Sequence, residues 1–164
     1  MARRPAIVLI LALLALAAGP AVPAANAACE DESIAIKAKN LSKARAALRC
    51  LVNAERTGRG TKKLSANDKL TRAAQSHAED MEKRDYFDHD TPEGKTAADR
   101  VLATGYEFTA LGENIARGYA TPKAAVKGWM KSKGHRDNIL GQQYTEFGLG
   151  VAKGKTYVNV FAAR

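Results

Sequence analysis

The last part of the chain carries the pattern that limits its fold most, two short apolar strands joined by a tight turn. Residues 147–152 (FGLGVA) and 156–162 (TYVNVFA) each have the composition of a strand, and the turn KGK (153–155) lies between them. A connection of this length that contains glycine favours an antiparallel hairpin. The chain therefore ends in antiparallel sheet that other segments must cover.

Apolar residues spaced three and four apart predict helices upstream of this hairpin. One helical face runs from Leu41 to Val52, and a second from Leu70 to Met81. Because Ser65 and Asp68 make an approximate capping box, we expect the second helix to begin at Ser65.

Shorter elements lie between the second helix and the hairpin. Residues 111–119 (LGENIARGY) are typical of a strand, and residues 121–132 predict a helix with Thr121 as N-cap and Pro122 in its first turn. We find no repeats, no linker and no regular alternation of strands with helices. The sequence therefore predicts one α+β domain, in which helices cover an antiparallel sheet.

The first 27 residues have the features of a secretory signal peptide. Arg3 and Arg4 precede an apolar run from Ile7 to Ala18, and AlaAsnAla (25–27) forms a cleavage signal. We expect cleavage after Ala27 and a secreted protein. Two alternatives are an uncleaved N-terminal membrane anchor and a lipoprotein attached through Cys29.

The predicted mature chain has 137 residues, which suits a single domain. It carries 24 basic and 17 acidic residues, a net charge of +7, which favours a position near an anionic envelope surface. The basic residues are dispersed, with few aromatic residues among them, so nucleic acid is not an expected partner. No other long apolar run follows, and we expect no transmembrane segment after cleavage.

Cys29 and Cys50 are the two cysteines of the chain. An even number of cysteines in an exported protein favours one disulfide, although two free thiols are the alternative. The bond would tie an N-terminal extension, residues 28–44, to the domain that we assign to residues 45–164.

Three residues are the candidates for chemistry. His89 lies between two aspartates, Glu113 lies between Gly112 and Asn114, and His135 follows a glycine. Two histidines and a carboxylate are enough for a zinc site that keeps an open position. The third histidine, His77, lies on an apolar helical stripe and is interpreted as a packed core residue, as is Trp129.

Four segments resemble bacterial CAP-domain proteins, the SCP-like family of cysteine-rich secretory, antigen 5 and pathogenesis-related 1 proteins. These segments are YFDHDTPEGKTAADRV (86–101), GENIA (112–116), GWMKSKGHRDNIL (128–140) and FGLGVA (147–152). The resemblance implies an α-β-α sandwich with a small antiparallel sheet between helical layers. It also implies that His89, Glu113 and His135 meet in one central cleft.

One member of the family's cleft is absent from this chain. Many animal and plant members have a second glutamate there, and the matching position here is Ser132. The usual set of two histidines and two glutamates is therefore incomplete, although the two histidines could still bind zinc or another divalent cation.

The resemblance suggests two classes of function. The first is a binding module for a lipid, a sterol-like molecule or a cell-wall ligand, with His89 and His135 as candidate metal ligands. The second is a metal-assisted hydrolase of peptide or ester bonds, with Glu113 as general base. The missing carboxylate at Ser132 favours the binding module over the enzyme, and leaves the enzyme as the alternative.

Overall fold

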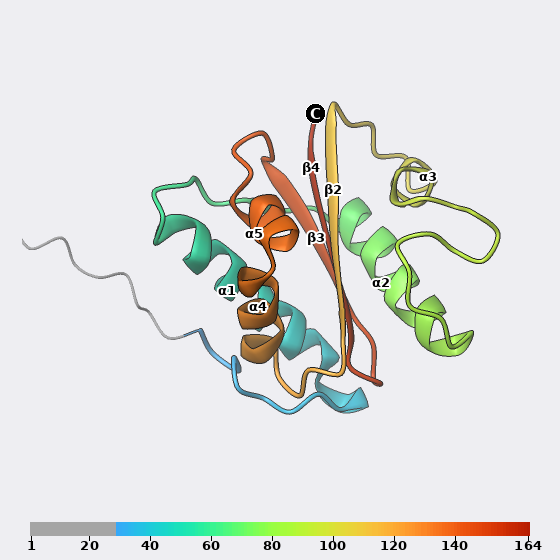
Figure 1. Ribbon diagram of the computed structural model, residues 1–164, viewed down its shortest axis with the longest axis horizontal. Helices are drawn as coiled ribbons and strands as arrows, with labels where there is room; N and C mark the ends of the chain where they lie inside the picture. The colour runs from blue at the N-terminus through green and yellow to red at the C-terminus, as the bar shows by residue number, and fades with distance from the viewer. Residues whose placement is uncertain (1–28) are drawn as a thin grey trace, which may run out of the picture.

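A four-stranded sheet with helices on both sides forms the fold, as Figure 1 shows. The structure is a computed structural model that describes residues 29–164, so the predicted signal peptide lies outside the described residues. One face of the sheet is covered by α1 (Leu41–Thr57), α4 (Pro122–Lys131) and α5 (Lys133–Leu140), and the other by α2 (Asp68–Lys83) and α3 (Ala97–Leu102). The predicted α-β-α sandwich is confirmed.

The sheet has the strand order β1-β3-β4-β2. Its strands are β1 (Ser65–Ala66), β2 (Ala110–Arg117), β3 (Glu146–Val151) and β4 (Thr156–Ala163). The predicted hairpin is confirmed, since β3 and β4 pair antiparallel, and β4 also pairs antiparallel with β2. The two-residue strand β1 differs from the expectation because it runs parallel to β3.

The predicted start of the second helix at Ser65 is wrong. Ser65 belongs to β1, and the N-cap of α2 is Asn67, whose side chain accepts hydrogen bonds from the backbone of Lys69 and Leu70. Pairing with β3 holds Ser65 in extended backbone: its N–H donates to the carbonyl of Thr145. A tertiary contact thus overrides the local capping pattern.

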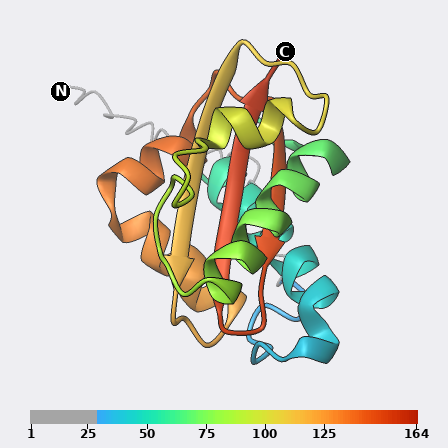
Figure 2. The same cartoon turned by 90° about the vertical axis from the view of Figure 1, so that its right-hand side faces the viewer.

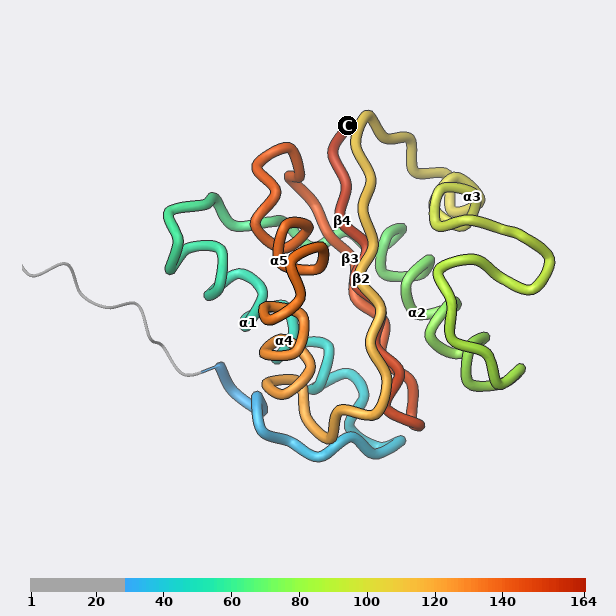
Figure 3. Tube along the Cα trace, in the orientation of Figure 1, coloured from blue at the N-terminus to red at the C-terminus, as the bar shows by residue number. Residues whose placement is uncertain are grey.

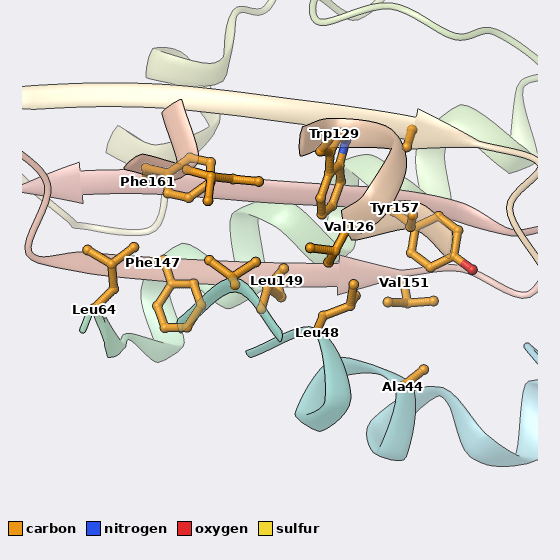
Figure 4. Packing of buried hydrophobic residues seen from close by; sticks show 14 of the residues in the cluster. Ala44, Leu48, Leu64, Val126, Trp129, Phe147, Leu149, Val151, Tyr157 and Phe161 are labelled. Carbon is orange, nitrogen blue, oxygen red and sulfur yellow. The ribbon is translucent and has the colours of Figure 1, made fainter. Parts of the chain in front are cut away.

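Both faces of β4 are buried, because successive side chains of a strand point to opposite faces. Tyr157 and Phe161 pack with Trp129 and Leu48 under the α1–α4–α5 layer (Figure 4). Val158 and its alternate neighbours pack under α2 on the other face. Trp129 is 1% exposed, which agrees with its interpretation as a core residue.

A disulfide joins Cys29 to Cys50 in α1, with the two Cα atoms 5.7 Å apart. The residues between Cys29 and α1 run past the start of α4, as the trace in Figure 3 shows. The N–H of Lys123 donates to the carbonyl of Glu32, and the N–H of Ile36 donates to the carbonyl of Ala120. Helix α1 begins at Leu41, inside the range 28–44 that the sequence assigned to an extension.

Helix α2 lies directly against β3 at two glycines, and Figure 2 shows the helix in front of the strands. A Cβ atom on Gly148 would lie 2.1 Å from the carbonyl carbon of Leu70, and one on Gly150 would lie 2.3 Å from the carbonyl oxygen of Ala74. Backbone therefore packs on backbone, and no side chain fits between the two elements.

We expect Gly148→Ala to destabilise the protein by more than about 3 kcal/mol, because overpacking typically costs 1–3 kcal/mol and here the obstacle is backbone. Gly134→Ala in α5 is the matched control, since a Cβ there meets nothing within 4 Å. It should be neutral or stabilising by up to about 1 kcal/mol. Denaturant unfolding measures both, and equal midpoints for the two variants would contradict the close packing.

Candidate functional site

The candidate site lies along β2, which is an edge strand of the sheet. Three backbone carbonyls of this strand accept hydrogen bonds from side chains outside the sheet. Trp129 Nε1 donates to Ile115, Asn138 Nδ2 donates to Glu113, and Tyr144 Oη donates to Leu111. These bonds close much of an edge that would otherwise be free to pair with another strand, and they fix α4 and α5 beside β2.

Asn114 points from β2 toward α5 and places His135. Its Nδ2 donates to the carbonyl of His135 at 2.9 Å, while its Oδ1 accepts from Asn138. His135 is the third residue of α5, which begins at Lys133. The stretch from Ser132 to Leu140 thus contains both His135, a candidate site residue, and Asn138, whose side chain binds Asn114 and so holds α5 against β2.

Glu113 points to the opposite face of β2, and its side chain is 4% exposed. Oε1 accepts from His89 Nδ1 at 2.9 Å, and Oε2 accepts from Arg100 Nη2 at 2.8 Å. A buried carboxylate is tolerated only when it is paired and hydrogen-bonded, and both oxygens of Glu113 meet that condition.

Arg100, in α3, is the residue that the sequence interpretation missed. Besides Glu113, its guanidinium binds the backbone carbonyls of His89 and Lys95, so it ties the connection 84–96 to β2. The sequence contained one indirect signal. A glutamate in an apolar strand requires a cation, and Arg100 lies in the segment 86–101, one of the four that resemble CAP-domain proteins. The sequence alone did not distinguish Arg100 from the other basic residues.

The charges of the site follow from these contacts. Burial alone would raise the pKa of Glu113, but the hydrogen bond from His89 and the charge of Arg100 hold that pKa below its usual value. The hydrogen bond to Glu113 raises the pKa of His89. Burial, and then the nearby charge of His89, lower the pKa of His135. The site therefore contains a carboxylate, one imidazole that favours its proton and one that favours the neutral form.

Ser132 does not join these residues through hydrogen bonds. It connects α4 to α5 as the C-cap of one and the N-cap of the other, and its side chain makes no capping hydrogen bond. In the part of the chain that the structure describes, no three His, Cys, Asp or Glu side chains are grouped to hold a metal ion. The Glu113 carboxylate is hydrogen-bonded to His89 and Arg100 instead.

Two hollows of about 900 and 880 Å³ lie elsewhere on the molecule. The first lies between η1 (Ala38–Asn40), the end of α2 and the β3–β4 turn, and the second between α2, α3 and the connection 84–96. Neither is lined by His89, Glu113 or His135, although Arg100 borders the second. Of the three candidate residues, His89 and Glu113 are hydrogen-bonded to each other, and the backbone of His135 is bonded to Asn114, the neighbour of Glu113 on β2.

His77 is buried in α2, with 1% of its surface exposed, and its Nε2 lies 3.0 Å from the carbonyl oxygen of Asp88. Since a carbonyl only accepts, Nε2 is the protonated nitrogen. This contact supports the connection that carries His89, and it agrees with the interpretation of His77 as a packed histidine.

Sequence and structure comparisons identify the family. The profile of the Cysteine-rich secretory protein family, CAP, matches residues 50–163. The uncharacterized protein YkwD of Bacillus subtilis is 38% identical over 115 residues, which cover 70% of this chain and 45% of YkwD. The chain belongs to the CAP family.

Solved structures agree with this assignment. An extracellular SCP-domain protein of Bacillus anthracis is 31% identical, with a TM-score of 0.69 over 78% of this chain and 41% of that protein. An outer surface protein of Borrelia burgdorferi shares the fold at 20% identity, with a TM-score of 0.67 over 79% and 97% of the two chains. The chain spans less than half the length of YkwD and of the B. anthracis protein.

Loss of the Arg100 guanidinium should be costly, because it leaves the buried Glu113 carboxylate without its permanent cation. We expect Arg100→Ala to lower the free energy of unfolding by about 3–5 kcal/mol. The exposed ion pair of Lys133 with Asp137 provides the control, and Lys133→Ala should cost less than about 1 kcal/mol. Adding Glu113→Gln to Arg100→Ala should recover part of the loss in denaturant unfolding. No recovery would mean that Arg100 acts through packing alone.

Acid should destabilise the protein through His77. Burial lowers the pKa of His77 in the folded state, with a further contribution from Arg100, so the unfolded chain binds this proton at higher pH. The stability that neutral His77 contributes is fully present above the pKa of this residue in the unfolded chain, near 6.5. It is lost as the pH falls from there toward the pKa of His77 in the folded protein. The His77→Gln variant keeps a donor for Asp88. Below pH 6.5 its free energy of unfolding should fall less steeply than that of the wild type, and the two slopes should differ by at most about 1.4 kcal/mol per pH unit. Parallel stability curves of the variant and the wild type would refute this.

Proposed function

We propose that the protein is an exported binding domain of the cell envelope, whose recognition site is the β2 edge around His89 and His135. The observation that carries the proposal is the state of Glu113. Its carboxylate is buried, and each of its oxygens is already bonded, one to His89 and one to Arg100. A carboxylate in this state orients its neighbours and is poorly placed to take a proton from water.

The two imidazoles suit a divalent cation such as zinc. Glu113 bonds Nδ1 of His89, so the other ring nitrogen, Nε2, is the one left for a metal. A carboxylate that orients a metal-binding histidine through its second nitrogen is a common arrangement. The lowered pKa of His135 favours its neutral, metal-binding form. A bound ion would supply a Lewis acid that attracts an oxygen-bearing ligand.

The alternative function, a metal-assisted hydrolase with Glu113 as general base, has less support. The pKa of Glu113 is held down by His89 and Arg100, so the carboxylate is a weak base. In addition, Ser132 stands where many members of the family have a second glutamate.

Several observations support export of the protein and its location at the cell envelope. The segment 1–27 has the features of a signal peptide, and the B. anthracis relative is described as extracellular. Within residues 29–164, no helix has the length and apolar character that crossing a membrane requires. We therefore infer a secreted protein. The domain assigned to residues 45–164 also needs the first turn of α1, which begins at Leu41. The family resemblance suggests lipid, sterol-like or cell-wall molecules as ligands.

Calorimetric titration with zinc tests the metal site. We expect the wild-type protein to bind about one zinc ion, and the His89→Ala/His135→Ala double variant to lose at least tenfold in affinity, in line with loss of both ligands. Asp90→Asn, next to His89 and exposed, is the control and should titrate like the wild type. Equal heats from wild type and double variant would eliminate the metal site.

Turnover assays separate the binding module from the hydrolase. The wild-type protein is incubated with peptide and ester libraries, with and without a metal chelator, and we expect no chelator-sensitive hydrolysis. If such hydrolysis appears and is abolished in a folded Glu113→Gln variant, the hydrolase replaces the binding module.

A further inference from the structure

The charged residues are divided unequally between the two sides of the sheet. Helices α1, α4 and α5 together contain nine basic and two acidic residues. On the opposite side, helices α2 and α3 contain four basic and five acidic residues, and residues 84–96, which lead from α2 toward α3, add two basic and four acidic residues. Among the nine basic residues of the first layer, Arg56 is buried and binds backbone carbonyls, so its charge faces inward. The remaining excess of six positive charges nearly equals the +7 of the whole predicted mature chain.

Lysines form a row along the exposed side of α4. Lys123, Lys127 and Lys131 are four residues apart, and all three are exposed. The spacing corresponds to about 6 Å along the helix axis. Within residues 29–164, Lys127 and Lys131 make no ion pair, and neither does the exposed Arg49 of the adjacent helix α1.

We propose that this surface, which we call the α4 lysine row, docks a linear polyanion whose phosphate groups repeat along the chain. Evenly spaced ammonium groups on one helix, of which Lys127 and Lys131 have no ion pair among the described residues, match a chain of phosphates. Release of counterions from such a chain favours association. The inference rests on the proposed envelope location, where polymers of this kind are accessible, but not on the metal site. The row is formed by α4, whereas Glu113 faces α3 on the other side of β2.

The distribution of apolar side chains favours a polymer over a lipid bilayer. Proteins that lie in a membrane interface bury large apolar residues beside their basic ones. Two of the three large apolar side chains that are exposed among the described residues, Phe87 and Leu102, belong to the acidic side of the molecule. The third, Tyr119, lies against Gly128 of α4. Among the described residues, a single exposed aromatic side chain therefore accompanies the α4 lysine row, which is less than insertion into a membrane interface requires.

Acidic residues of the N-terminal segment occupy one end of this surface. Glu32 binds Lys123 at 2.6 Å, and Asp31 lies 3.6 Å from Lys43 of α1. The disulfide of Cys29 holds both acids in place. A polyanion would have to compete with these two carboxylates, so their removal should strengthen binding.

Binding of inorganic polyphosphate to the processed protein, purified after export, tests the proposal between about 50 and 200 mM salt. We expect wild-type affinity to fall with salt, and Lys127→Glu/Lys131→Glu to bind at least about tenfold more weakly with a shallower salt slope. The control, Lys83→Glu/Lys153→Glu, makes the same change in net charge at two exposed lysines outside the row and should lose less than about threefold. Asp31→Asn/Glu32→Gln should bind more tightly than the wild type.

Equal losses in the row variant and the control would overturn the proposal, because they would show an effect of net charge alone. Binding to phosphatidylglycerol vesicles without binding to polyphosphate would overturn it in favour of a membrane. If charge reversal impairs folding, Lys127→Gln/Lys131→Gln replaces it with the same expected order of affinities. His89→Ala/His135→Ala should bind polyphosphate like the wild type, so failure of the metal site and failure of this inference can be distinguished.

Discussion

The edge of β2 is the constraint on which the rest of the structure depends. An edge strand exposes backbone carbonyls, and here side chains of Trp129, Asn138 and Tyr144 bind three of them. The same bonds that protect the edge hold α4 and α5 against it, and so determine where His135 lies. On its other face the strand carries Glu113, whose burial requires Arg100 and draws the connection bearing His89 toward the sheet.

This arrangement supports the proposal that the site binds a ligand and that Glu113 is not a general base. A general base must be free to accept a proton, whereas Glu113 is neutralised by a guanidinium and an imidazole. Its bonds to His89 and Arg100 join the connection 84–96 and α3 to β2. In the proposed function, the two histidines are the groups that contact a ligand or a metal ion.

Elements with a strong local pattern could be predicted from the sequence, and contacts between distant residues could not. The helical stripe of Leu70 and Met81 and the terminal hairpin needed only periodicity. Ser65 was assigned to a helix because its pairing with β3 involves a strand about eighty residues away. The resemblance pointed to His89, Glu113 and His135, but Arg100, which binds Glu113, could be found only from the structure, because its contact joins α3 to β2.

The unequal charges of the two helical layers make the protein an electric dipole directed across its sheet. Such a molecule turns in the field of a charged surface before any contact is made. A negatively charged wall would attract the α1–α4–α5 side and repel the side that contains residues 68–102. Orientation would then precede recognition, and the side bearing α2 and α3 would face the surroundings.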